Sequence, residues 1–221
     1  MTRVLGWLAA LGLLAGVAAG FGYAPREAIQ GNVQRIMYLH VPSVLTAYLA
    51  FGLVLLGSIA YLATRRPGWD RLAASAAEIG VLFTAITIVS GSIWGKPTWG
   101  TWWTWDARLT STAILFVIYL GYLLLRSVVD DPERAATYAA VLGIVGALDV
   151  PIIHFSVEWW RTLHQPATVL KPQAPSMDAV MLRALLVNVA AFLATFAYLG
   201  ARRYRLLSLR AEAMARALRG A

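Results

Sequence analysis

Long apolar runs separated by short charged segments dominate the pattern of this chain. Runs without Asp, Glu, Lys or Arg cover residues 4–25, 36–64, 79–95, 109–125 and 184–201, with a shorter run at 135–148. A helix needs about 20 apolar residues to cross the hydrocarbon of a bilayer. The five longer runs reach this length with their flanks, and the sixth reaches it with residues 150–153. The pattern predicts six transmembrane helices, with approximate spans 4–24, 41–63, 72–93, 109–125, 135–153 and 179–200.

The composition supports an all-α integral membrane protein with a single domain over residues 1–221. The chain is 59% hydrophobic and 14% charged, whereas soluble domains carry about 25% charged residues. No internal repeat or second domain is visible. Cysteine is absent, which excludes disulfides, thiolate nucleophiles and iron–sulfur ligation by this chain.

The distribution of charge predicts which side of the membrane each loop faces. The net charge is +8, but most Lys and Arg fall in alternate loops, around residues 3, 65–71, 126–134 and 202–219. Because positive loops stay in the cytoplasm, we expect both termini inside. Residues 202–221 then form a basic cytoplasmic tail, expected as a surface helix on anionic lipid rather than a nucleic-acid site.

Some helix boundaries are suggested by local signals. Residues 4–22 resemble the core of a signal peptide, but their length favours a retained first helix. Residues 37–42 are expected to open the second helix, with Pro42 in its first turn. The fifth helix is expected to end near Pro151, followed by a long outer loop at 154–177.

A Trp-rich segment, residues 94–106, lies between two of the apolar runs and faces outward in this topology. It holds five of the nine Trp of the chain, namely Trp94, Trp99, Trp102, Trp103 and Trp105. Indole offers a large apolar surface and one N–H donor. Gly95, Pro97 and Gly100 predict that no simple helix continues through the segment. An aromatic belt at the membrane interface is one interpretation. A platform for a planar ligand explains the clustering better.

The three histidines also fall on the outer side. His40 lies at the start of the second helix, and His154 and His164 flank the exit of the fifth. A lone His is more often structural than a ligand, but the shared depth of the three favours a common site. Haem iron accepts imidazole on both axial sides, and its macrocycle suits indole stacking.

Two arginines on the same side are candidates for binding the haem propionates. Arg35 and Arg108 can each bind a carboxylate through two parallel hydrogen bonds, although anchoring to lipid headgroups is an equal alternative for both. Asp106 could orient Arg108 or cap the helix that follows.

Three segments, residues 38–42, 94–111 and 151–165, resemble the CcmC family of haem-handling proteins of bacterial cytochrome c maturation. The resemblance implies a b-type, non-covalently bound haem with His40 and His164 as axial ligands to the metal. It also implies that the Trp-rich loop, together with Trp159, holds this haem on the periplasmic face of the inner membrane. One departure is Asp149, where the family leads us to expect Asn.

The resemblance further implies a function and partners. CcmC-like proteins present haem to the haem chaperone CcmE, which captures it covalently, and they work with the CcmA/CcmB ATPase pair and the small protein CcmD. We expect no catalytic apparatus in this chain itself.

Two alternatives to this function stay open. A permease that translocates haem or another hydrophobic substrate would need polar groups at mid-membrane depth, where the helices offer chiefly Glu78 and Asn188. An intramembrane hydrolase would need a base near Ser111, and no His is close to it in sequence.

Overall fold

The computed structural model describes residues 2–166, 168–169 and 171–220, and it is helical with no β-strand over this part of the chain. Six helical segments are long and apolar enough to cross a membrane, which confirms the predicted count and fold class. The elements in order are α1 (Thr2–Val17), the π-helical η1 (Ala18–Tyr23), the 3₁₀ η2 (Val33–Ile36), α2 (Met37–Thr64), α3 (Pro67–Trp99), α4 (Ala107–Val128), α5 (Pro132–Ala147), α6 (Asp149–Trp159) and α7 (Ala179–Gly220).

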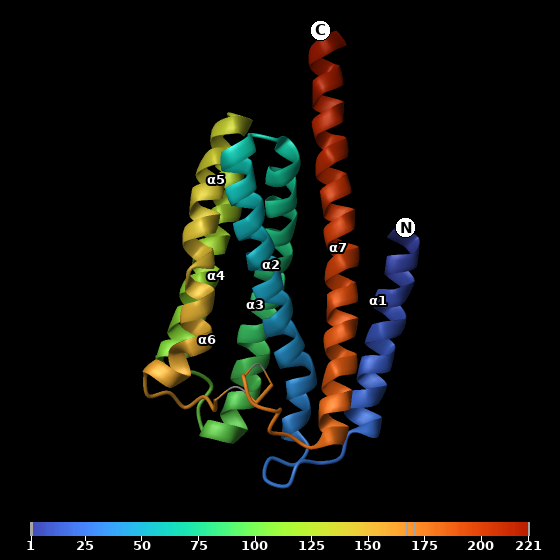
Figure 1. The fold of residues 1–221 in the computed structure, drawn as a ribbon, viewed down its shortest axis with the longest axis vertical. Helices are drawn as coiled ribbons and strands as arrows, with labels where there is room; N and C mark the ends of the chain where they lie inside the picture. Colours follow the sequence, from blue (N-terminus) through green and yellow to red (C-terminus); the bar gives the residue numbers. More distant parts are fainter. Residues whose placement is uncertain (1, 167, 170, 221) are drawn as a thin grey trace.

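The helices form two adjoining groups (Figure 1). Helices α2 to α6 make a bundle, and α1 packs against α7 beside it. Both termini lie at one end of the molecule, which we call the terminal end. The connections at 24–36, 100–106 and 160–178 gather at the opposite end, the loop end, and the site described below lies there.

Small residues let the bundle pack closely around a few large side chains. Phe51 is fully buried and lies against Gly80, where an added Cβ would come 2.6 Å from the ring. The Phe51 ring also stacks on Tyr119 at 3.9 Å between centroids, and the Tyr119 hydroxyl donates to the carbonyl of Gly143 at 2.9 Å. The core therefore depends on glycines at helix crossings.

Helix ends at the terminal end follow recognisable sequence signals. Asp131 caps α5 by accepting from the backbone N–H of Glu133 and Arg134, and Pro132 occupies the first position of that helix, where no donor is lost. Arg126 forms a bidentate ion pair with Asp70 at 2.6 and 2.8 Å, tying α4 to α3.

The prediction that the helix ends before the Trp-rich segment is wrong for the first half of that segment. Helix α3 continues to Trp99, with Pro97 inside its last turn. Pro97 is tolerated because only one backbone bond is lost near the helix end. Gly100 then ends the helix in the left-handed conformation (φ 80°), and its N–H donates to the carbonyl of Lys96 at 3.0 Å. This is the usual role of glycine after a helix C-terminus.

Two other helix boundaries also differ from the predictions. Helix α2 begins at Met37, so Pro42 lies inside the helix and not in its first turn. The predicted fifth helix is two helices, α5 and α6, separated at Leu148, and α6 continues past Pro151 to Trp159. His154 and Trp159 are therefore helical, and the outer loop begins only at Trp160.

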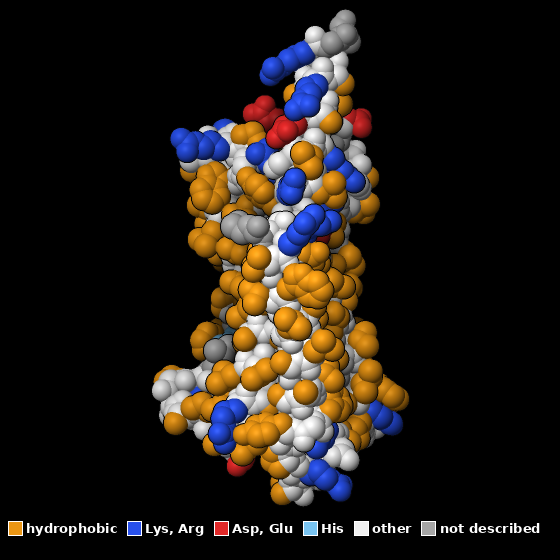
Figure 2. Space-filling model, turned by 90° about the vertical axis from the view of Figure 1, so that its right-hand side faces the viewer, with side chains coloured by type: hydrophobic (Ala, Val, Ile, Leu, Met, Phe, Trp, Pro, Cys, Tyr) orange, Lys and Arg blue, Asp and Glu red, His pale blue; other side chains and the backbone are white. Residues whose placement is uncertain are grey.

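The basic tail does not have the expected form of a helix lying flat on the membrane. Residues 202–220 continue α7 without a break, and this part of α7 projects beyond the bundle in Figure 1. Figure 2, which views the α1 and α7 side, shows hydrophobic side chains over the middle of the molecule and Lys and Arg gathered towards its two ends. This distribution matches a membrane-spanning protein with both ends in polar surroundings.

Candidate functional site

His40 is held on α2 by a hydrogen bond that defines which of its nitrogens is free. It is 8% exposed, and its Nδ1 lies 3.1 Å from the Ser90 hydroxyl of α3. That hydroxyl donates its own hydrogen to the carbonyl of Ile86 at 2.6 Å, so it accepts from His40 Nδ1–H. The neutral ring therefore keeps the lone pair of Nε2 for a ligand, as metal-binding histidines commonly do.

The packing around His40 leaves little freedom for its ring. Trp94 meets it edge to face at 5.8 Å between centroids. On α3, Gly91 lies so close that an added Cβ would be 2.9 Å from His40 Cε1. Trp94 is itself fixed, because its Nε1 donates to the Gln30 side chain at 2.8 Å.

His164 lies in the loop after α6 and reaches the same space from the other side. Its ring contacts Trp99 at 5.3 Å between centroids in an edge-to-face arrangement, and its backbone N–H donates to the Thr162 hydroxyl at 2.8 Å. Burial, followed by the neighbouring Arg108 and His40, lowers the pKa of His164 to about 3. The imidazole is therefore neutral near pH 7 and can act as a ligand.

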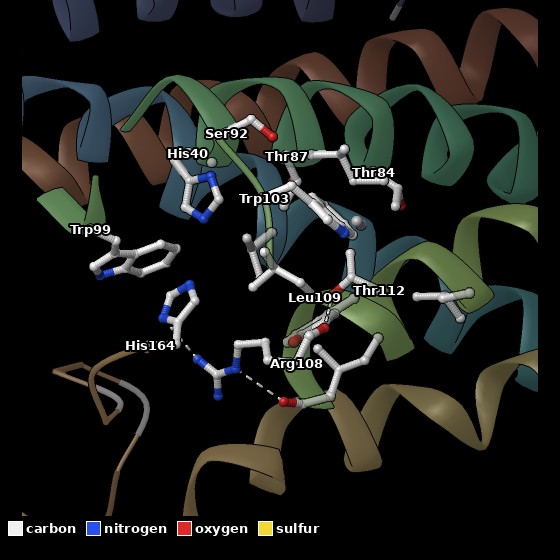
Figure 3. Close-up of a pocket in the computed structure, with 17 residues that line it drawn as sticks. His40, Thr84, Thr87, Ser92, Trp99, Trp103, Arg108, Leu109, Thr112 and His164 are labelled. Atoms are coloured by element: carbon white, nitrogen blue, oxygen red, sulfur yellow. Dashed lines mark hydrogen bonds between the residues drawn. The ribbon is translucent and has the colours of Figure 1, made fainter. Parts of the chain in front are cut away.

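Arg108, in the first turn of α4, joins three elements through its guanidinium. It donates from Nε to the carbonyl of Ile153 at 3.2 Å and from Nη2 to that of His154 at 2.7 Å. Its Nη1 lies 3.5 Å from His164 Nδ1, and Figure 3 shows the guanidinium between His164 and α6. These donors position His164 rather than pointing freely into the pocket.

The N–H groups of Arg35 also donate hydrogen bonds to other parts of the protein. They reach the carbonyls of Gly20 and Ala24 and the side chain of Asn32. The guanidinium thus ties together the connection between α1 and α2. The sequence left propionate binding and anchoring to lipid headgroups as equal alternatives for Arg35, and these contacts favour a structural role instead.

Asp106 links the Trp-rich segment to the loop that carries His164. One carboxylate oxygen caps α4 by accepting from Leu109 N–H at 2.9 Å, and the other accepts from Leu163 N–H at 3.2 Å. The capping role was one of the two sequence hypotheses for this residue. The bond to Leu163 joins residues far apart in sequence, and no feature of the sequence predicted it.

The tryptophans divide into two sets. Trp94, Trp99 and Trp103 are partly buried and face the histidines or the cavity below them, whereas Trp102 and Trp105 are 57% and 77% exposed. Trp159 is 56% exposed and stacks on Phe155. The five tryptophans therefore do not form one flat platform.

Two cavities meet at the histidines. The outer pocket, of about 630 Å³, lies among α2, the start of α7 and the loop-end connections, and its walls include Val41, Tyr48, Trp94, Met177 and Met181. The deep pocket, of about 100 Å³, lies between α2, α3 and α4 and is lined by Thr87, Trp99, Trp103 and Thr112 among others. His40, Arg108 and His164 border both cavities. Figure 3 shows the two imidazoles beside Trp99 at the deep pocket.

The donor set fits a porphyrin better than a bare metal ion. Among the described residues, no group of three or more His, Asp and Glu is placed to hold a metal, so iron would need other ligands such as the four pyrrole nitrogens. The outer pocket has the size of known cofactor pockets, about 300–1,000 Å³. Within the described part of the chain, Trp103 Nε1 and Thr87 Oγ1 are buried without partners at the deep pocket, which suits a polar ligand edge or water there.

Several contributors to the site were missed by sequence reasoning. Ser90, Gln30 and Thr162 orient His40, Trp94 and His164, and Gly91 makes room for the His40 ring. Each is a common residue type whose role depends on a tertiary contact. His154 lines the outer pocket, but only its backbone carbonyl contacts Arg108.

The fold and the site together define a six-helix membrane protein with a ligand pocket at one end, bordered by two neutral imidazoles. Comparison with known proteins gives the family. The sequence profile described as "Heme exporter protein C" matches residues 1–219, and the chain belongs to this family, CcmC.

Relatives in three bacteria carry the same description. The chain is 45% identical over 217 residues to Heme exporter protein C of Bradyrhizobium diazoefficiens, covering 96% of this chain and 82% of the relative. It is 41% identical over 198 residues to that of Haemophilus influenzae, with 90% and 80% covered. It is 41% identical over 193 residues to that of Escherichia coli K12, with 87% and 78% covered. The profile match extends over both histidines and the Trp-rich segment.

The division of the tryptophans gives a first prediction. We expect Trp99→Ala to weaken haem binding about tenfold or more, because removing this indole frees His164 and opens the pocket wall. Trp105→Ala should change it less than about twofold, since that side chain is largely exposed and contacts Trp103. Titration of the purified variants with haemin measures both. Equal loss in the two variants would show that the tryptophans act as one surface.

Proposed function

We propose that this protein binds haem between His40 and His164 and presents it at the loop end to a haem chaperone. The observation that carries the proposal is the pair of neutral imidazoles, brought by α2 and by the 160–178 loop to one largely apolar pocket. The relatives named Heme exporter protein C support the choice of ligand. In this proposal the haem is b-type, non-covalent and a cargo to be passed on.

Release of the cargo follows from a competition at His164. An arginine can only donate, so His164 Nδ1 accepts from Arg108 and the neutral ring carries its proton on Nε2. Binding iron through Nε2 would place the proton on Nδ1, facing the Arg108 donor. The bond to Arg108 must then be given up, and regaining it favours the haem-free state. This competition supports a site that holds haem without trapping it.

The partners in the proposal are those of a cytochrome c maturation system: the chaperone CcmE as the haem acceptor, with CcmA, CcmB and CcmD as companions. One relative, from Marchantia polymorpha, is described as a putative cytochrome c biosynthesis ccmC-like mitochondrial protein, which supports this setting. No nucleic-acid partner and no catalytic activity of the chain itself are part of the proposal.

The alternative of a permease is less well supported by the geometry. The outer pocket and the deep pocket, which the two histidines border, both lie at the loop end. At mid-depth, the polar Asn188 is satisfied, donating to the carbonyls of Gly16 and Ala184 at 3.0 and 2.8 Å. A ligand bound at one end and handed to an acceptor on that side fits these features better than passage through the bundle.

The test is an absorption spectrum of the purified protein, followed by transfer to the purified acceptor. We expect a Soret band of a six-coordinate haem and its loss to a CcmE-type chaperone added in excess. A protein that purifies without haem and gives no Soret band when haemin is added would contradict the proposal.

The orientation in the bacterial inner membrane is the next prediction, and it rests on the bias of Lys and Arg towards the terminal end. We expect the loop end to face the periplasm. Reporter fusions at Gly68, at Asp131 and after the C-terminus should all show cytoplasmic activity. A periplasmic signal from any of these positions would place the haem pocket on the wrong side for this function.

A further inference from the structure

A groove that the proposed function does not use lies between α1 and α7, away from the haem pocket and towards the terminal end. Its volume is about 300 Å³, which is the volume that roughly ten water molecules occupy in liquid water. It is lined by Thr2, Arg3, Gly6, Trp7, Ala10, Tyr198 and Arg202. Figure 2 looks onto this side of the molecule.

Two arginines, one from each helix, line this groove. Arg3 comes from α1 and Arg202 from α7, and within the described part of the chain neither takes part in a salt bridge. The neighbouring Arg203 behaves differently, because it pairs with Glu78 of α3 at 2.6 Å. The groove thus holds two cations where a membrane protein meets the headgroups, and it attracts an anion.

The rest of the lining has the character of a lipid interface. Trp7 and Tyr198 are the aromatic types that prefer the headgroup level, and Trp7 is 70% exposed. Gly6 lets the Tyr198 ring pack against α1 at the groove, since an added Cβ would lie 3.0 Å from that ring. Beyond Ala10 the outer face of α1 continues with exposed leucines, Leu11 and Leu14. A polar mouth therefore leads onto an apolar surface.

We propose that this groove binds an anionic phospholipid, with its phosphate between Arg3 and Arg202 and its acyl chains along α1. Each guanidinium group can donate two parallel hydrogen bonds to phosphate oxygens, and the positive charge of the site complements the anion. This inference does not depend on the haem proposal.

The lipid would add a link at the terminal end of a helix pair that already packs closely. Helix α1 contacts α7 mainly through small residues, such as Gly12 against Ala191 and Gly16 against Asn188. Near the groove the contact is lined instead by the two arginines and Tyr198, which an anion can draw together. The bound phosphate therefore fastens α1 to α7.

The experiment measures lipid retention by the full-length protein in a neutral detergent, using native mass spectrometry. The probes are phosphatidylglycerol, phosphatidylcholine with the same acyl chains, and glycerol 3-phosphate. The double variant R3Q/R202Q is compared with R205Q/R210Q, which loses the same charge from exposed tail positions outside the groove. Thermal unfolding with and without phosphatidylglycerol gives a second readout.

We expect the wild type and R205Q/R210Q to retain phosphatidylglycerol in preference to phosphatidylcholine. R3Q/R202Q should bind it roughly tenfold more weakly and lose the thermal stabilisation that it gives. Equal losses in the two double variants would overturn the site, because the attraction would then be to the basic end as a whole. Equal binding of phosphatidylcholine, or glycerol 3-phosphate binding as tightly as the lipid, would overturn the assignment to an anionic phospholipid.

Discussion

Replacing either His40 or His164 with Gly is expected to abolish the six-coordinate haem spectrum and to lower haem affinity by more than about 100-fold. This exceeds the 10–100-fold loss typical of residues that only support a metal ligand, because a coordinate bond to iron is itself removed. Each Gly leaves a space the size of an imidazole, so added imidazole should restore the spectrum in part. Absorption spectra of haem-loaded variants, with and without imidazole, measure both effects.

His154→Ala is the matched control for this prediction. His154 borders the outer pocket, but Arg108 uses only its backbone carbonyl, at 2.7 Å, and Ala keeps that carbonyl in place. The variant should therefore retain the six-coordinate spectrum. If His154→Ala lost the six-coordinate spectrum and His164→Gly kept it, His154 and not His164 would be the iron ligand.

The transmembrane architecture was predictable because it depends on local properties of the chain. The length of an apolar run sets whether it can cross the bilayer, and Asp131 with Pro132 marks the start of α5 whatever the rest of the chain does. The depth of His40 and His164 follows from the same runs. The count of six helices therefore needed no knowledge of tertiary contacts.

The sequence was less informative where two local signals compete or where a contact is distant in sequence. Gly95, Pro97 and Gly100 together predicted that the helix stops before the Trp-rich segment, but only Gly100 is the position where the chain turns. The prediction for Arg108 recognised a cation but not its partners, since Ile153 and His164 are more than 40 residues away. A carbonyl and a carboxylate attract the same guanidinium, and only the folded arrangement decides between them.

Gly91→Ala is expected to lower haem affinity about 10–100-fold while leaving the fold intact. Its Cβ would lie 2.9 Å from Cε1 and 3.4 Å from Nδ1 of His40, so the ring must move, and with it the hydrogen bond to Ser90 at 3.1 Å. Overpacking of this kind lowers the free energy of unfolding by about 1–3 kcal/mol, and the higher helix propensity of Ala raises it by about 1 kcal/mol. The net effect on stability is therefore small compared with the effect on the iron ligand.

Gly52→Ala provides the control, because it makes the same exchange inside α2, where nothing lies within 4 Å of the new Cβ. It should gain the helix propensity without moving either histidine, and its haem affinity and spectrum should match the wild type. Haemin titration and thermal unfolding of both variants separate ligand displacement from general destabilisation. Wild-type affinity in Gly91→Ala would show that the His40 ring is not confined as described, and that iron ligation does not depend on its contact with α3.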